Sequence, residues 1–144
     1  MRIIATLIFL LSLCGVACAA DAPDSLSLKT GGSIFASAFS VKLSASGKLN
    51  VEKTATPNER AKTFERQLSL AQSKEIFLLA SQSSDFAVAC DQVADGTGAG
   101  MRVTYEGVEK IYSCNNAAQW PVGAITTKLL ATINRYLPKD MQVF

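Results

Sequence analysis

The stretch "FASAFSVKLSASGKLNVEK", Phe35 to Lys53, decides the fold class. Apolar and polar residues alternate through both of its halves, as in strands that bury one face. Ser46-Gly47 separates the halves and is typical of a tight turn, because glycine adopts positive φ without strain. The stretch therefore predicts an antiparallel β-hairpin. The row expected on one face is Phe35, Ser37, Phe39, Val41 and Leu43, followed after the turn by Leu49 and Val51.

Working outward, "SLSLKT" (residues 25–30) alternates before the hairpin, and residues 57–68 after it permit two interpretations. Thr56-Pro57-Asn58-Glu59 resembles a capping box, which would start one long helix running to Ser83. Alternatively, "KTFERQL" is a third strand and Ser69-Leu70-Ala71-Gln72 caps a shorter helix, the interpretation that we favour. In either case "LAQSKEIFLLASQ" is predicted to be helical. Its expected buried residues are Ile76, Phe77, Leu79 and Ala80.

The second half of the chain predicts another hairpin and another helix. "MRVTYEGVEKIYSC" (residues 101–114) alternates on both sides of a turn at Gly107. From Pro121 to near Pro138, apolar residues follow the 3.6-residue spacing of a helix. The predicted fold is therefore α+β: an antiparallel four- to five-stranded sheet with two amphipathic helices on one face, ββαββα-like. The residues of the helical pattern are Val122, Ile125, Leu129, Ile133, Tyr136 and Leu137.

The N-terminal segment has the three-part plan of a secretory signal peptide. Arg2 precedes an apolar run, and Ala17 and Ala19 occupy the −3 and −1 positions of a cleavage site. The run is shorter than the roughly 20 apolar residues of a membrane span. We therefore predict a signal peptide over residues 1–19, one α+β domain over residues 20–144, and a periplasmic or secreted mature protein. Lipidation of Cys18 is the alternative, although Gly15 stands where a larger apolar residue is usual.

Composition argues against several classes of function. The chain has a net charge of +2 and scattered basic residues, which gives no electrostatic case for nucleic acid. It has no histidine, so Ser–His–Asp and Cys–His catalysis are impossible as usually built. Cleavage of the signal peptide would leave two cysteines, Cys90 and Cys114, which are too few for a zinc site without histidine. Glu106 and Glu109 occupy polar positions typical of a solvated face. We expect no enzyme, no metal and no cofactor.

Two further segments carry specific expectations. In an exported chain, Cys90 and Cys114 are expected to form a disulfide. The run "DGTGAG", Asp95 to Gly100, lacks the lysine of a phosphate-binding loop and precedes a strand pattern, so it predicts a flexible connection.

The order of these signals resembles a known family. Gly31-Gly32 before a strand, the Ser46-Gly47 turn, "RQLS" before a helix, "DGTG" before a hairpin and "WP" before the last helix follow its plan. The chain resembles, over most of residues 25–138, the small bacterial ββαββα domains that include the emfourin-type inhibitors of thermolysin-like metalloproteases. The resemblance implies inhibition of a protease through a protein–protein contact. It implies no individual functional residue, and the export signal and cysteine pair depart from it.

Candidate contact residues lie in two segments. "NNAAQWP" carries Asn115, Asn116 and Trp120, where tryptophan is typical of an interface, although packing on the helix that follows is the interpretation that we favour. "GGSIFAS" carries Ile34 and Phe35, which could also simply supply the core. The expected function is an exported small binding protein with a protein partner, in its most specific form an inhibitor of an envelope or secreted hydrolase. The alternative is a lipid-anchored or periplasmic structural component of the envelope.

Overall fold

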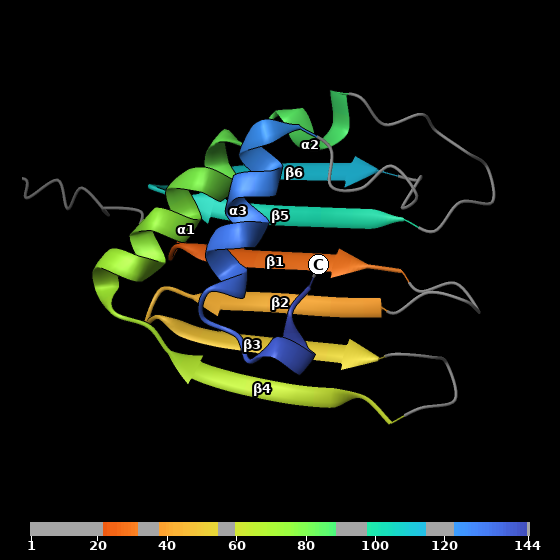
Figure 1. Cartoon of the computed structure of the whole chain (residues 1–144). Coiled ribbons are helices and arrows are strands. Elements are labelled where there is room, and N and C mark those ends of the chain that lie inside the picture. The colour runs from red at the N-terminus through yellow and green to blue at the C-terminus, as the bar shows by residue number, and fades with distance from the viewer. Residues whose placement is uncertain (1–21, 32–37, 55–59, 89–97, 115–122, 144) are drawn as a thin grey trace, which may run out of the picture.

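The protein is a two-layer α+β domain whose sheet is antiparallel throughout (Figure 1). The structure, a computed structural model, describes residues 22–31, 38–54, 60–88, 98–114 and 123–143. Within these ranges six strands form one sheet in the order β4-β3-β2-β1-β5-β6. The strands are β1 (Ser25–Thr30), β2 (Ala38–Ser44), β3 (Lys48–Thr54), β4 (Lys62–Gln67), β5 (Ala99–Tyr105) and β6 (Val108–Cys114).

The α+β class and the antiparallel sheet are confirmed, but the expected strand number of four to five is too low. The difference arises from β1, which pairs with both β2 and β5 and so joins two hairpins into one sheet. Leu28 lies opposite Val41 on one side and opposite Met101 on the other. Alternation reveals a strand, whereas a pairing across more than seventy residues of chain leaves no local signal.

The uncertain segment before the first helix is a strand, so the long-helix interpretation is wrong. β4 pairs with β3 through Lys62–Gln67, and α1 (Leu70–Gln82) begins immediately afterwards. The Ser69 side chain accepts a hydrogen bond from the backbone N–H of Gln72, and the Gln72 side chain accepts one from the N–H of Ser69. This reciprocal capping box fixes the start of α1. All four residues expected to be buried are buried: Ile76, Phe77, Leu79 and Ala80.

The last helix is shorter than its apolar pattern. α3 spans Ala124–Asn134, so Tyr136 and Leu137 pack on the core from the turn that follows it. Pro121 and Val122, expected at its start, lie outside the described residues. A short helix that the pattern did not predict, α2 (Asp85–Val88), stands between α1 and β5. The chain closes with a 3₁₀ turn, η2 (Lys139–Met141).

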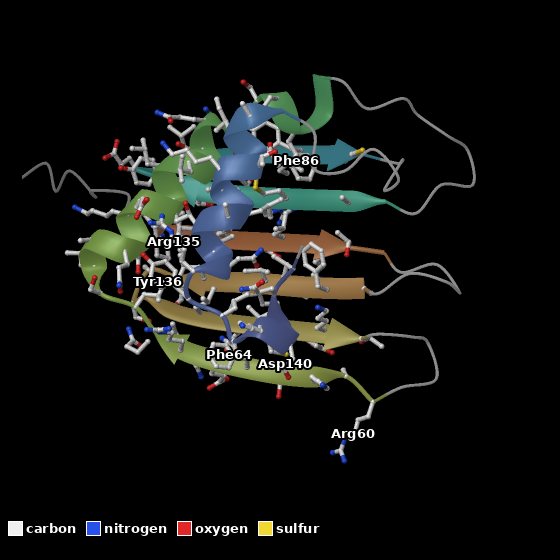
Figure 2. All side chains as sticks on the ribbon, viewed as in Figure 1. Arg60, Phe64, Phe86, Arg135, Tyr136 and Asp140 are labelled. Atoms are coloured by element: carbon white, nitrogen blue, oxygen red, sulfur yellow. The ribbon has the colours of Figure 1, made fainter. Side chains whose placement is uncertain are left out.

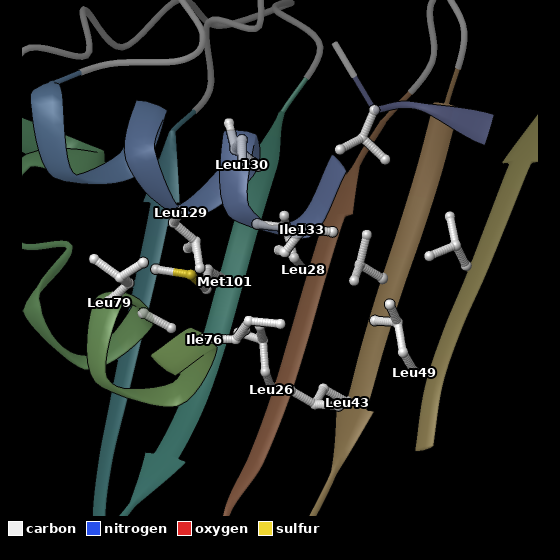
Figure 3. Close-up of a cluster of buried hydrophobic side chains, with 14 of the residues drawn as sticks. Leu26, Leu28, Leu43, Leu49, Ile76, Leu79, Met101, Leu129, Leu130 and Ile133 are labelled. Carbon is white, nitrogen blue, oxygen red and sulfur yellow. The ribbon is translucent and has the colours of Figure 1, made fainter. Parts of the chain in front are cut away.

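Both long helices lie on the same face of the sheet and bury one row from each central strand (Figures 1 and 3). Leu129, Leu130 and Ile133 of α3 face the strands together with Ile76 of α1 (Figure 3). Burying side chains of this size stabilises the fold by about 1.5–3 kcal/mol each. The buried residues of the central strands, which the two helices and the C-terminal segment cover together, are Leu26, Leu28, Val41, Leu43, Leu49, Val51, Met101 and Val103. Among the described residues no helix has the length and apolar character needed to cross a membrane.

Candidate binding surface

All the contact residues expected from the sequence lie outside the described part of the chain: Ile34, Phe35, Asn115, Asn116 and Trp120. Cys90, expected in the disulfide, lies outside it as well. Cys114 is described, and it is fully buried at the end of β6 opposite Ala99. The Cys90–Cys114 disulfide therefore stays a prediction. Of the glycine run, Ala99 and Gly100 already belong to β5, which agrees with a connection that leads into a strand.

The second face of the sheet is the candidate site, because no described helix covers it (Figure 1). The same alternation that sends leucines toward α1 and α3 sends polar side chains the other way. We call this the open face. One row across it holds Gly100, Lys29, Ser40, Glu52 and Thr63, each opposite the next on a neighbouring strand. The adjacent row is Arg102, Ser27, Lys42, Asn50 and Glu65.

The open face is not flat, since small residues alternate with long ones. Three shallow pockets of about 270, 210 and 370 Å³ are lined by its side chains. Lys42, at the centre of the sheet on β2, lines all three of them. Serines 27 and 40 are half-buried, whereas the side chains of Lys42 and Glu52 are exposed. The three pockets together form a shallow strip across the open face, with the ammonium group of Lys42 at its middle.

The charges on the open face divide into paired and unpaired groups. Lys48 Nζ lies 3.0 Å from Glu65 Oε2, and Arg102 Nε lies 3.6 Å from Glu109 Oε1. In the described part of the chain no ion pair involves Lys29, Lys42 or Glu52. Lys29 and Lys42 are diagonal neighbours on β1 and β2, because Lys29 faces Ser40 and Lys42 faces Ser27. Diagonal neighbours on adjacent strands are within reach of long side chains.

Asn50 adds an uncommon feature to this cation pair. Its Oδ1 atom is the one buried side-chain oxygen or nitrogen in the described residues that has no hydrogen-bond partner. Asn50 faces Lys42 across the β2–β3 pair and lines two of the three pockets. Buried polar atoms in proteins nearly always have a partner, and an exception calls for an explanation.

The described residues contain no cluster that indicates catalysis or metal binding. No group of three or more Cys, Asp or Glu side chains in them could hold a metal ion. Glu106 lies in the β5–β6 turn with φ of 50°, and Glu109 is engaged by Arg102. The open face therefore offers hydrogen bonds and charges to a ligand, and it offers no arranged acid, base or nucleophile.

The residues that define this site are Lys29, Lys42, Asn50 and Glu52, and sequence reasoning did not select them. Alternation places them on the polar face of their strands, where solvated side chains are the ordinary expectation. What distinguishes them is that the described residues give them no ion-pair partner or, for Asn50 Oδ1, no hydrogen-bond partner. This depends on which residues the register between strands places beside them. Register is a property of the assembled sheet.

No protein-family model and no curated protein matches the chain.

Proposed function

We propose that this chain is an exported small binding protein that acts by covering part of a partner protein. The open face of its sheet is the contact surface. The observation that carries the proposal is that three pockets meet at Lys42 on a face that no helix of the described residues covers. A polar and shallow surface supports recognition of a partner better than it supports catalysis, which needs enclosed and perturbed groups.

The more specific form of the proposal is an inhibitor of an envelope or secreted hydrolase. It is supported by the predicted signal peptide over residues 1–19 and by the resemblance to emfourin-type inhibitors. A steric inhibitor needs no catalytic residue, which is compatible with a chain that has no histidine. Trp120 and Phe35 are proposed as additional contacts. A Cys90–Cys114 disulfide would tie the end of β6 to the segment before β5.

The second proposal is a lipid-anchored or periplasmic structural component of the envelope, and one measurement tests its lipid-anchored form. Intact mass of the mature protein gives residues 20–144 without addition if ordinary cleavage occurs. Acylation at Cys18 would add several hundred daltons and move the mature N-terminus to that cysteine.

Site-specific photo-cross-linking tests the contact surface. Benzoylphenylalanine replaces Lys42 in one variant and Lys74, an exposed residue of α1, in the control. The proteins are expressed in their native export pathway, irradiated, and analysed by mass spectrometry. We expect one dominant adduct from position 42 and none from position 74. Adducts from position 74 alone would place the contact on the helical layer and overturn the proposed surface.

If the adduct is a hydrolase, its turnover is then measured with and without the purified protein. Inhibition at one-to-one stoichiometry supports the inhibitor. An unchanged rate leaves a binding protein that does not inhibit.

A further inference from the structure

The charges of the open face specify what its partner carries. Lys29 and Lys42 line the same pocket, and the one carboxylate that shares it with them is Glu52. The two other cations near this strip, Lys48 and Arg102, already have Glu65 and Glu109 beside them. The centre of the face therefore keeps one positive charge in excess, on ammonium groups without an ion-pair partner among the described residues.

The hydrogen-bonding groups narrow the chemistry further. Ser27, Ser40 and Asn50 lie beside the two lysines on the open face, and all three are half-buried. Hydroxyl and side-chain amide groups both donate and accept hydrogen bonds. A peptide segment with acidic side chains matches this set, because its carboxylates suit the lysines and its backbone N–H and C=O groups suit the polar neighbours.

We infer that the open face binds an acidic peptide segment of the partner, with its carboxylates at Lys29 and Lys42 and its backbone beside Ser40 and Asn50. The inference rests on the proposed function and deepens it. Glu52 lies within the same strip and opposes a dense polyanion such as nucleic acid, whereas a peptide places its charges apart. The three adjoining shallow pockets suit an extended segment better than one compact ion.

A titration with a defined peptide tests the inference. Purified mature protein, labelled with ¹⁵N, is titrated with an acetylated and amidated hexaglutamate peptide at low salt, and hexalysine and inorganic phosphate serve as comparison ligands. We expect amide shifts confined to residues around Lys29, Ser40, Lys42, Asn50 and Glu52. Lys42→Glu should weaken binding at least about tenfold, the scale of one hydrogen bond to a charged group. Lys74→Glu, on the helical layer, should leave affinity unchanged.

Asn50→Ala separates a binding residue from a structural one. It removes an acceptor without a partner, so the melting temperature should stay the same or rise. Affinity for hexaglutamate should nevertheless fall, by about threefold to tenfold. A lower melting temperature with unchanged affinity would show that Asn50 supports the fold alone. Should Lys42→Glu fail to fold, Lys42→Gln removes the charge while keeping a long side chain.

Several results would overturn the inference. Equal shifts around Lys74 and Lys128 on the helices would indicate general charge attraction. Phosphate that shifts the same amides as strongly as hexaglutamate would indicate an anion site that needs no peptide. An adduct from position 42 in the cross-linking experiment, with no binding of hexaglutamate, would sink this inference and leave the proposed function standing. If neither the adduct from position 42 nor binding of hexaglutamate is found, both this inference and the proposed contact surface are overturned.

Discussion

At the scale of single residues, one carboxylate organises the start of the last helix. The N-cap residue of α3 is Gly123, which has no side chain to cap the helix. Asp85 of α2 supplies the cap from forty residues away, and Asp85 Oδ2 accepts a hydrogen bond from the N–H of Ile125 at 2.7 Å. Asp85 Oδ1 accepts bonds from the N–H and the hydroxyl of Thr126 at 3.2 and 2.7 Å. A negative charge also suits the positive end of the helix dipole.

Asp85→Ala is expected to lower the free energy of unfolding by about 1–3 kcal/mol, because it removes hydrogen bonds to a charged cap. Urea denaturation followed by circular dichroism measures the change. The control is Asp140→Ala, which removes an exposed ion pair of 3.6 Å with Lys62. Such pairs contribute about 0–1 kcal/mol. Equal losses in the two variants would contradict the capping role.

Tyr112 is expected to make the free energy of unfolding depend on pH in the alkaline range. Burial raises the pKa of its phenol above the ordinary value of 10.0, and the negative charge of Asp85 raises this pKa further. The folded chain therefore keeps the phenol proton to higher pH than the unfolded chain does. Its contribution to the free energy of unfolding is intact below pH 10 and is lost as pH rises through the folded pKa. Urea denaturation of wild type and Tyr112→Phe between pH 8 and 11 tests this, and Tyr112→Phe should lose less stability. Identical slopes would show that Tyr112 has no such role.

At the scale of elements, the sequence predicted most of what is local. The hairpin around Gly47, the strand at residues 62–67, the capping box at Ser69 and the hairpin around Gly107 are all confirmed. Each depends on alternation, turn chemistry or capping within a few residues. The sequence did not predict the pairing of β1 with both β2 and β5, or the capping of α3 by Asp85. Both features join segments that are far apart in the chain. The sequence also did not predict that, among the described residues, Lys42 has no ion-pair partner and Asn50 Oδ1 has no hydrogen-bond partner, because both facts depend on the register between strands.

Gly47 links two elements and predicts a specific cost of substitution. Its φ is +83°, its N–H donates to Ser44 O, and its carbonyl accepts from the N–H of Leu68 where β4 leads into α1. A Cβ atom at position 47 would lie 2.6 Å from Leu68 O. Gly47→Ala should therefore destabilise by about 1–3 kcal/mol, the scale of a residue forced into a strained conformation.

Gly100→Ala is the matched control for that substitution. A Cβ atom there would have Tyr112 O as its nearest neighbour at 3.9 Å, which is ordinary contact. It should therefore change stability by less than about 1 kcal/mol, and in the stabilising direction. Thermal unfolding of both variants is the measurement. A Gly47→Ala protein as stable as wild type would show that the turn has room to relax.

At the scale of the whole molecule, the helical layer is built from two unequal parts. α1 and α3 cover the half of the sheet that contains β1 and β5, and the C-terminal segment crosses toward β3 (Figure 1). Figure 2 shows Phe64 of β4 in the same region as Asp140 of that segment, and the Lys62–Asp140 pair joins the two elements. Lys53 of β3 donates to the carbonyl of Gln142 at 2.6 Å. The segment braces the strands that carry Asn50 and Glu52 on their opposite face.

Removal of residues 139–144 tests that brace. Met141 and Val143 are both buried, so the truncation should cost at least about 3 kcal/mol, at about 1.5 kcal/mol or more for each buried side chain. Urea denaturation gives the loss, and binding of a dye specific for exposed apolar surface should rise. Because β2 and β3 lose support, hexaglutamate binding should weaken even where the truncated chain remains folded. Met141→Ala in the full chain should give a smaller loss of stability with binding retained. A truncated protein as stable as wild type would show that α1 and α3 alone hold the sheet, and the open face would then owe nothing to the C-terminal segment.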